Sequence, residues 1–312
     1  MTTRGPEIFS AEDFLANPGM FAGLEPPVRL GVIGDPVAHS KSPSFQNAAL
    51  DFCGIPARYG KLHVPPDRMA EVLRALPAAG FLGVNVTIPH KAAALNCVDE
   101  ADSYAKAAGS VNTIVVHGSK LLGFNTDGPG LVRAVREEFA VEVRDLRVAI
   151  LGAGGGAGRA IAVQCAIEGC KRLVLANRTL DKARDLAHTL APFFPPRTAI
   201  GPEEKLVAIP LDETALRREL KNIDLLINAT SLGMKDTDRS VVPASWLAPD
   251  LLVYDTVYAG GTSRLLEDAS AAGARGANGL GMLLHQGALS FEIWFQRSAP
   301  LDEMRRALHA EL

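Results

Sequence analysis

Residues 146–160 have the sequence LRVAILGAGGGAGRA, an apolar run that passes directly into a cluster of glycines. The run 146–151 is typical of a buried parallel strand, and a helix is expected after the glycines. A strand, a glycine turn and a helix together form a dinucleotide-binding unit, because glycines let the backbone approach a pyrophosphate that the helix N-terminus attracts. A plain strand-to-helix turn is the alternative, so the rest of the chain must decide.

The next predicted strand, Arg172–Ala176, ends in Asn177, Arg178 and Thr179. An NAD-binding unit carries an acidic residue at this place, about 20 residues after the glycines, to bind the ribose 2′-hydroxyl. Here the chain has a fixed cation between two polar side chains, and Lys182 follows one helical turn later. These side chains suit a 2′-phosphate and favour NADP, with a solvated surface arginine as the alternative for Arg178.

Short apolar runs alternate with helix-length segments along nearly the whole chain, which is typical of an α/β architecture. An antiparallel hairpin is expected where Val111–Val116 and Leu121–Phe124 meet through His117-Gly118-Ser119. A long amphipathic helix from Leu280, with a last helix after it, is too long for another Rossmann crossover. The remaining predicted strands are Arg29–Gly34, Arg58–His63, Phe81–Val86, Asp224–Asn228 and Leu251–Asp255.

This pattern predicts a two-domain α/β protein. Residues 29–126 together with 279–312 would form an N-terminal mixed-sheet substrate domain, to which the C-terminal helices return. Residues 127–278 would form a Rossmann-type NADP-binding domain, and residues 1–28 a loosely packed extension. A length of 312 residues agrees with two domains at roughly 150 residues each.

Composition narrows the class of protein further. The chain is 47% hydrophobic and 21% charged, with a net charge of −3, so it has no overall basic field that would suit nucleic acid or a membrane surface. Its four cysteines form no CxxC pair, and we expect buried free thiols in a reducing compartment. No apolar run is long enough to span a membrane, and the first 27 residues have no secretory h-region. We therefore expect a cytoplasmic protein. We also expect a monomer or a homodimer whose partners are small molecules, with no nucleic acid, no membrane and no metal.

Seven motifs resemble, in order, those of the shikimate dehydrogenase family. They are GDPVAHSKSP (34–43), NVTIPHK (85–91), SVNT (110–113), GFNTDG (123–128), NRT (177–179), NATSLGM (228–234) and NGLGMLLHQ (278–286). The resemblance covers about residues 29–297. It implies an enzyme of the shikimate pathway for aromatic amino-acid biosynthesis that reduces 3-dehydroshikimate to shikimate with NADPH.

The resemblance also implies a catalytic pair, Lys91 and Asp127. Lys91 would give a proton to the developing C3 alkoxide, and Asp127 would orient it and bind a substrate hydroxyl. From the residues alone each has a structural alternative. A lysine in the first turn of a helix is mildly disfavoured by the helix dipole but is tolerated when solvated. An aspartate before Gly-Pro is a good helix N-cap.

The remaining site residues are likewise implied by the resemblance. The substrate would contact Ser40, Ser42, Asn85, Thr87, Asn112, Tyr258 and Gln286. The cofactor would contact Gly152, Gly154, Gly155, Gly156, Ala157, Asn177, Arg178, Thr179, Lys182, Thr230, Gly279 and Met282. The structural alternatives are N-capping for the two serines, core packing for Tyr258 and plain exposure for Gln286.

Three departures from the family pattern stand out. Gln46 replaces the usual histidine, which we expect to affect packing more than chemistry. The glycine loop is one residue longer before Arg159, and the segment 259–262 after Tyr258 lacks the usual proline. Two other functions remain in view: a quinate/shikimate dehydrogenase that uses NAD, and a metabolite sensor without activity. The presence of both Lys91 and Asp127, without a DNA-binding motif, disfavours the sensor.

Overall fold

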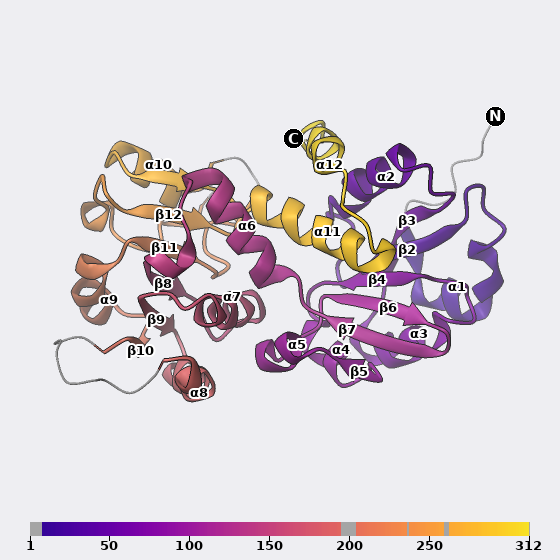
Figure 1. Cartoon of the computed structure of the whole chain (residues 1–312), viewed down its shortest axis with the longest axis horizontal. Helices are drawn as coiled ribbons and strands as arrows, with labels where there is room; N and C mark the ends of the chain where they lie inside the picture. The colour runs from indigo at the N-terminus through magenta and orange to yellow at the C-terminus, as the bar shows by residue number, and fades with distance from the viewer. Residues whose placement is uncertain (1–7, 195–203, 236, 259–261, 312) are drawn as a thin grey trace. The chain divides into compact units, whose positions relative to one another are not determined.

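The computed structural model describes residues 8–194, 204–235, 237–258 and 262–311 (Figure 1). The chain forms two compact units. Unit 1 combines Met1–Thr126 with Leu284–Leu312, and unit 2 is Asp127–Leu283. The C-terminal segment joins unit 1 from residue 284, whereas the sequence suggested residue 279. Glycine and apolar residues at 279–283 therefore lie in unit 2.

Unit 1 is built on a mixed seven-stranded sheet with the order β1-β3-β2-β4-β6-β7-β5. The strands are β1 Ile8–Ser10, β2 Val28–Gly34, β3 Arg58–His63, β4 Gly83–Val86, β5 Glu100–Ala101, β6 Thr113–His117 and β7 Lys120–Phe124. The first four pair in parallel, and β6 pairs antiparallel with both β4 and β7. The predicted hairpin is confirmed, and Gly118 at its tip has a φ of 63°, which a two-residue hairpin loop requires.

The helices of unit 1 include one whose start the sequence signals directly. In α2 (Ser42–Phe52) a proline occupies the first turn, and α12 (Leu301–His309) packs along it. The long helix α11 (Leu280–Phe295) contributes residues 284–295 to this unit. The other helical elements are α1 Ala11–Ala16, α3 Met69–Ala75, α4 Lys91–Leu95, α5 Ser103–Ala108 and the 3₁₀ turns Pro18–Phe21 and Pro66–Arg68.

The expectation of a loosely packed N-terminal extension is wrong for residues 8–28. Strand β1 pairs with β3, and Phe14 and Phe21 are completely buried in the core of unit 1. Their rings pack edge-on or tilted against each other and against Phe9 and Phe81, with centroids 4.7–5.7 Å apart. Three phenylalanines within 13 residues were the sequence signal for burial, because so much apolar surface is costly to leave in water.

Unit 2 contains a six-stranded parallel sheet in the order β10-β9-β8-β11-β12-β13. The chain starts in the middle at β8, adds β9 and β10 on one side, and then returns to add the other three. This is the strand order of the Rossmann fold, so the predicted fold class is confirmed. The strands are β8 Arg147–Leu151, β9 Arg172–Asn177, β10 Leu206–Pro210, β11 Leu225–Asn228, β12 Leu252–Asp255 and β13 Arg275–Ala277. The edge strands β10 and β13 were not predicted. β13 is three residues long with two exposed residues, so it carries no apolar pattern, whereas the apolar run of β10, LVAIP, was a signal that the sequence analysis missed.

Four helices lie between strands of this sheet, and a fifth precedes β8. The four are α7 Gly156–Ile167, α8 Leu180–Leu190, α9 Glu213–Glu219 and α10 Arg264–Ala271, and the helix before β8 is α6 Asp127–Phe139. The short 3₁₀ turns of this unit are Val143–Asp145, Ala191–Phe193, Leu220–Asn222 and Ala244–Trp246. The apolar stripe predicted for α6 is confirmed, because Leu131, Val132, Val135 and Phe139 are all buried.

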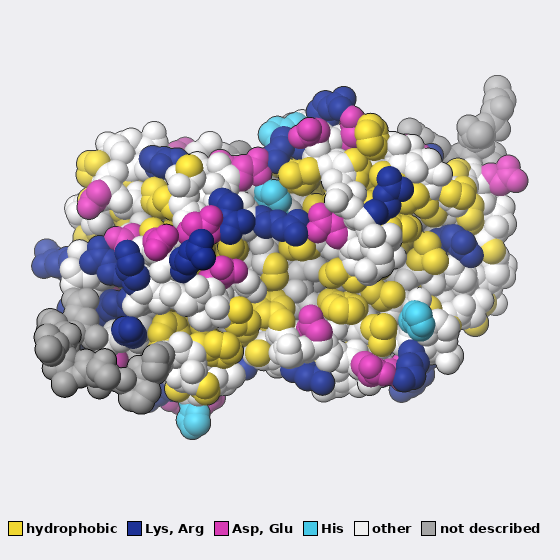
Figure 2. All heavy atoms as spheres, in the orientation of Figure 1, with side chains coloured by type: hydrophobic (Ala, Val, Ile, Leu, Met, Phe, Trp, Pro, Cys, Tyr) yellow, Lys and Arg dark blue, Asp and Glu magenta, His cyan; other side chains and the backbone are white. Residues whose placement is uncertain are grey.

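The surface mixes both signs of charge. On the face shown in Figure 2, Lys and Arg side chains lie beside Asp and Glu side chains in both units. Within the described ranges, no helix is long and apolar enough to cross a membrane. The four cysteines are free thiols, and burial raises the pKa of Cys170 to about 12. A thiol with so high a pKa is unreactive at neutral pH.

The buried N-terminal aromatic cluster generates a stability prediction. Phe21→Ala is expected to lower the free energy of unfolding by about 3–5 kcal/mol, because it removes a ring from a filled core. Phe52→Ala is the matched control, since that ring is 65% exposed, and its cost should stay within about 0.5 kcal/mol. Urea unfolding followed by circular dichroism measures both. Equal costs for the two variants would contradict the packing of the N-terminal segment.

Candidate functional site

Three glycines at the turn and helix start of unit 2 lie where a Cβ would meet other atoms. Gly152 has a φ of 85°, and a Cβ there would lie 2.8 Å from the carbonyl oxygen of Ala229. A Cβ on Gly158 would collide with the carbonyl of Gly152, and one on Gly154 would lie 2.8 Å from the Cβ of Lys182. Helix α7 begins at Gly156 directly after the turn. The N–H groups of the turn are bonded inside the protein, those of Gly152 and Ala153 to the carbonyl of Ala176. The first N–H groups of a helix have no partner within the helix, so the glycine-lined start of α7 suits a phosphate group.

The adjacent strand β9 supports this turn at its carboxyl end. The Oδ1 atom of Asn177 accepts a hydrogen bond from the N–H of Gly154 at 3.1 Å, and its Nδ2 donates to the carbonyl of Thr179 at 2.9 Å. Asn177 therefore holds the two loops together. Arg178 and Thr179 follow it with exposed side chains, as does Lys182 on α8. Arg178 and Lys182 thus add two exposed cations close in sequence to Asn177, and the Cβ of Lys182 lies beside Gly154.

A second polar cluster joins the carboxyl ends of β11 and β12. The Thr230 hydroxyl donates to Oδ1 of Asn228 at 2.7 Å, and Nδ2 of Asn228 donates to Asp255 at 2.9 Å. Asp255 is completely buried and also accepts from the Ser263 hydroxyl at 2.5 Å. Burial raises the pKa of Asp255, and these donors oppose the shift. The cluster fixes the strand ends next to Gly152, where ligands bind in open α/β sheets.

Residues at the start of α11 belong to the same unit. A Cβ on Gly279 would collide with the carbonyl of Thr256, so this position also needs a glycine. The backbone N–H of Met282 donates to the hydroxyl of Tyr254 at 2.9 Å, which satisfies one N–H of the first helical turn. Tyr258 lies just after β12, and burial raises its pKa. The loop that follows it, 259–261, lies outside the described residues.

In unit 1 the two predicted serines lie at the entry to α2. The hydroxyl oxygen of Ser40 accepts from the N–H of Ser42 at 3.3 Å. Ser42 is the first residue of α2 and buried, so it is not the N-cap that the sequence allowed as an alternative. Two lysines fix this loop: Lys41 donates to the carbonyl of Glu311 at 2.9 Å, and Lys61 donates to that of Ala38 at 2.7 Å.

The asparagines predicted to bind substrate lie close together in unit 1. Asn85 on β4 donates to the carbonyl of Asn112 at 3.1 Å, and both side chains are buried. Thr87 follows β4 and packs against Gly34 at the end of β2. Gln286 lies half-buried on α11, where its carbonyl accepts from the Ser290 hydroxyl at 3.0 Å. Sequence reasoning missed Ser290, although its position four residues after Gln286 places both on one helix face.

The two predicted catalytic residues each begin a helix. Lys91 is the first residue of α4, and its carbonyl accepts from the N–H of Val111 at 2.9 Å. The buried His90 beside it donates from Nε2 to the carbonyl of Val64 at 2.6 Å, which anchors the loop. Asp127 is the first residue of α6 in unit 2 and is only 3% exposed. Each residue therefore lies at the start of a helix in its own unit, Lys91 in unit 1 and Asp127 in unit 2.

Comparison with known proteins finds similarity along most of the chain. Residues 32–114 match the model of the shikimate dehydrogenase substrate binding domain, and residues 279–309 match that of the shikimate 5′-dehydrogenase C-terminal domain. The shikimate dehydrogenase (NADP(+)) of Methanopyrus kandleri is 43% identical over 281 residues, which cover 89% of this chain and 94% of that relative. The chain belongs to the shikimate dehydrogenase family.

Solved structures of the family are similar over nearly the whole chain. A shikimate dehydrogenase in complex with NADP+ has a TM-score of 0.81 and 37% identity, and the match covers 90% of this chain and 94% of that one. The enzyme from Thermus thermophilus, in complex with NADP(H) and shikimate, has a TM-score of 0.79 and 33% identity, with coverage of 91% and 100%. The similarity therefore extends over both units.

The family departure at Gln46 has a clear structural effect. Gln46 is 1% exposed, and its Nε2 donates to the carbonyl of Gly287 at 2.8 Å. Its Oε1 is buried without a hydrogen-bond partner in the described part of the chain. A Cβ on Gly287 would collide with the ring of Phe45, so glycine at this position allows close packing. This residue thus packs α2 on α11 next to Gln286, in line with the packing role expected for it.

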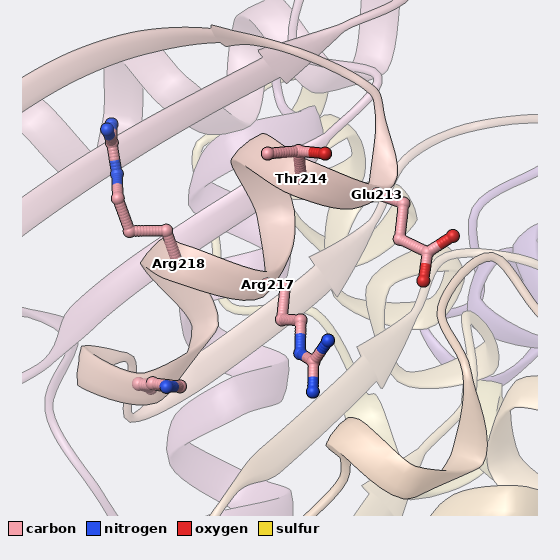
Figure 3. A pocket seen from close by; sticks show the side chains of 5 residues that line it. Glu213, Thr214, Arg217 and Arg218 are labelled. Atoms are coloured by element: carbon pink, nitrogen blue, oxygen red, sulfur yellow. The ribbon is translucent and has the colours of Figure 1, made fainter.

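An open depression on α9 is separate from these residues. It is lined by Glu213, Thr214, Arg217, Arg218 and Lys221. Figure 3 shows Arg217 and Arg218 extending in different directions from the helix. No residue of the predicted site lines it, and its cations do not converge on one point. Among the described residues, no cluster of three or more His, Cys, Asp or Glu side chains could hold a metal ion.

The glycine turn generates a second prediction. Gly158→Ala is expected to lower the urea midpoint of unfolding, because its Cβ would meet the backbone of Gly152 and the turn must shift. Gly156→Ala is the matched control, since nothing lies within 4 Å of a Cβ built there. The control should leave the midpoint unchanged or slightly higher, as alanine favours a helix. Equal midpoints for both variants would contradict the close approach at Gly158.

Proposed function

We propose that this chain catalyses the reversible, NADP-dependent reduction of 3-dehydroshikimate to shikimate in aromatic amino-acid biosynthesis. The observation that carries the proposal is the match to the NADP(+)-dependent shikimate dehydrogenase of Methanopyrus kandleri over 89% of the chain. A relative from Symbiobacterium thermophilum with the same name is 43% identical over 91% of the chain. The chain is therefore an oxidoreductase that acts on a CH–OH group of a small molecule.

The residues of unit 2 fit NADP(H). Gly154 and Gly158 form a turn that a Cβ would fill, so the backbone can approach a pyrophosphate. Exposed Arg178 can bind a 2′-phosphate through its planar guanidinium, and exposed Lys182 adds a point charge. When bound, NADPH supplies the hydride that reduces the C3 carbonyl. The other members of the proposed cofactor set surround the same turn, or lie at the end of β11 and the start of α11.

Most of the residues proposed to bind the substrate and supply the proton lie in unit 1, whereas Tyr258 and Asp127 lie in unit 2. Ser40 and Ser42 bind the substrate carboxylate, and the asparagines, Thr87, Tyr258 and Gln286 contact the ring hydroxyls. Lys91 gives a proton to the C3 oxygen as the hydride reaches C3, so that the carbonyl becomes an alcohol. Asp127 orients Lys91 and binds a hydroxyl. These roles follow from the positions that each residue holds in the family motifs.

The proposal extends to location and assembly. The four free thiols suit a reducing compartment, and we place the protein in the cytoplasm. The substrate and cofactor are its small-molecule partners. Sedimentation velocity distinguishes a monomer from a homodimer.

The proton donor generates the third prediction. Lys91→Ala is expected to lower kcat by about 10²–10⁴-fold, the range for loss of a positioned acid–base group, with a much smaller change in KM. The matched control is Lys120→Ala, an exposed lysine of unit 1 that forms an ion pair with Glu100 on β5. Steady-state oxidation of shikimate with NADP measures both. A folded Lys91→Ala enzyme with near-normal kcat would remove Lys91 from the mechanism.

The proposed cofactor site generates a fourth prediction. Wild-type enzyme is expected to prefer NADP over NAD by at least about ten-fold in kcat/KM, since a charge-assisted hydrogen bond contributes roughly 1.5–3 kcal/mol. Arg178→Ala should remove most of this preference by weakening NADP alone. Arg184→Ala, an exposed arginine on α8 that pairs with Asp181, should leave it intact. A wild-type preference for NAD would instead favour the quinate/shikimate dehydrogenase.

A further inference from the structure

Buried polar side chains form a continuous hydrogen-bonded network inside unit 1. Tyr59 on β3 and Ser290 on α11 are 3% and 0% exposed, and both bond to the side chain of Asn85. Thr113 on β6 and Thr126 after β7 extend the network to Asn112. The network thus joins strands that are far apart in sequence to the helix that carries Gln286.

The network fixes which way the Asn85 amide points. Its neighbour at 3.1 Å is the backbone carbonyl of Asn112, which can only accept, so the group that faces it must be Nδ2. Nδ2 also lies 2.9 Å from the Ser290 hydroxyl and 3.1 Å from that of Thr113. Both amide hydrogens are therefore used inside the protein. Oδ1 then faces the Tyr59 hydroxyl at 2.8 Å, and the phenol must donate to it.

A backbone group also fixes the orientation of the Asn112 amide. Its Oδ1 accepts from the backbone N–H of Thr126 at 2.8 Å, and an N–H can only donate. The Thr126 hydroxyl accepts from Nδ2 of Asn112 at 2.9 Å. The hydroxyls of Thr113 and Ser290 are 2.8 Å apart and lie between the two amides. The Ser290 hydroxyl donates its one hydrogen to the carbonyl of Gln286, so toward Asn85 it acts as an acceptor.

Tyr59 has no alternative to its phenol form. Burial raises its pKa well above the usual range, against a smaller opposing effect of a hydrogen bond with Ser42. The ring packs beside Trp294, with centroids 6.1 Å apart, and Trp294 donates to the carbonyl of Ile114 at 3.0 Å. The Tyr59 ring is therefore packed against Trp294, while its hydroxyl donates a hydrogen bond to Asn85.

We propose that Tyr59 and Ser290 are positioning residues that hold the Asn85 amide with both hydrogens bound internally, so that Asn85 meets the substrate only as an acceptor, through Oδ1. A ring hydroxyl that binds there must donate its hydrogen. This inference rests on the proposed function, because it concerns how the substrate-binding asparagine is oriented. It adds two residues that contact no substrate and act through Asn85.

Two conservative variants test it. Tyr59→Phe and Ser290→Ala each remove one hydroxyl, and each is expected to raise the KM for shikimate about three- to ten-fold, the effect of one neutral hydrogen bond. The KM for NADP should change less than about two-fold, since the cofactor residues lie in unit 2. Isothermal titration with shikimate should show the same loss of affinity. The controls, Tyr104→Phe on α5 and exposed Ser119→Ala in the hairpin, should leave both KM values unchanged.

A double-mutant cycle separates positioning from general loss of structure. If Tyr59 acts through Asn85, then Tyr59→Phe should change the shikimate KM less than about two-fold when Asn85 is already alanine. The same holds for Ser290→Ala. Effects that simply multiply with that of Asn85→Ala would overturn the proposal, as would an unchanged shikimate KM in both single variants. Should one variant fail to fold, the other still decides the question.

The outcome also separates this inference from the proposed function. Wild-type enzyme that does not oxidise shikimate with NADP would refute the function itself. Wild-type activity with an unchanged shikimate KM in Tyr59→Phe and Ser290→Ala would refute only the positioning role. Equal rises in the KM values for shikimate and NADP would indicate a general folding defect and would also overturn it.

Discussion

A buried amide must find its hydrogen-bond partners inside the protein, and in unit 1 this requirement decides how separate segments meet. Asn85 is 6% exposed, and its partners come from β3, β6 and α11. A donor or acceptor left unpaired there would cost about 1–3 kcal/mol, comparable with a large fraction of a domain's net stability. The strand order of the mixed sheet and the position of α11 bring the hydrogen-bond partners of the Asn85 amide together.

Unit 2 obeys a different constraint, which is close backbone approach in a fully buried parallel sheet. Its central strand β8 is covered on both faces, so the chain must leave it through a turn that packs against β9 and β11. Gly152 and Gly158 make that turn possible, and Asn177 and Asn228 hold the neighbouring strand ends by bonds to loop backbone. The start of α7 lies at this edge beside exposed Arg178 and Lys182, which is the chemistry that a dinucleotide phosphate needs.

Two residues of the proposed chemistry, Lys91 and Ser42, lie on backbone that other segments of unit 1 hold by hydrogen bonds and packing. Lys91 starts a short helix whose backbone is tied to Val111, and His90 beside it is fixed to Val64. Ser42 is the first residue of α2, and α2 packs on α11 through the hydrogen bond from Gln46 to Gly287. Such support keeps reacting groups in place before substrate arrives, so that less ordering is needed during the reaction.

The sequence by itself determined the α/β class, the hairpin, the Rossmann unit and the family motifs. These features depend on the local period of apolar residues and on a glycine cluster that directly follows a strand. The sequence also identified the candidate site residues, though their roles came through the family motifs. It did not reveal the role of Phe14 and Phe21, the edge strands β10 and β13, or the network through Tyr59 and Ser290. Those features depend on partners distant in sequence: a phenylalanine becomes core, and a serine becomes an orienting group, only when the fold places another segment against it. Tertiary structure alone decided which way the Asn85 amide points, since the atom that fixes it is a backbone carbonyl 27 residues away.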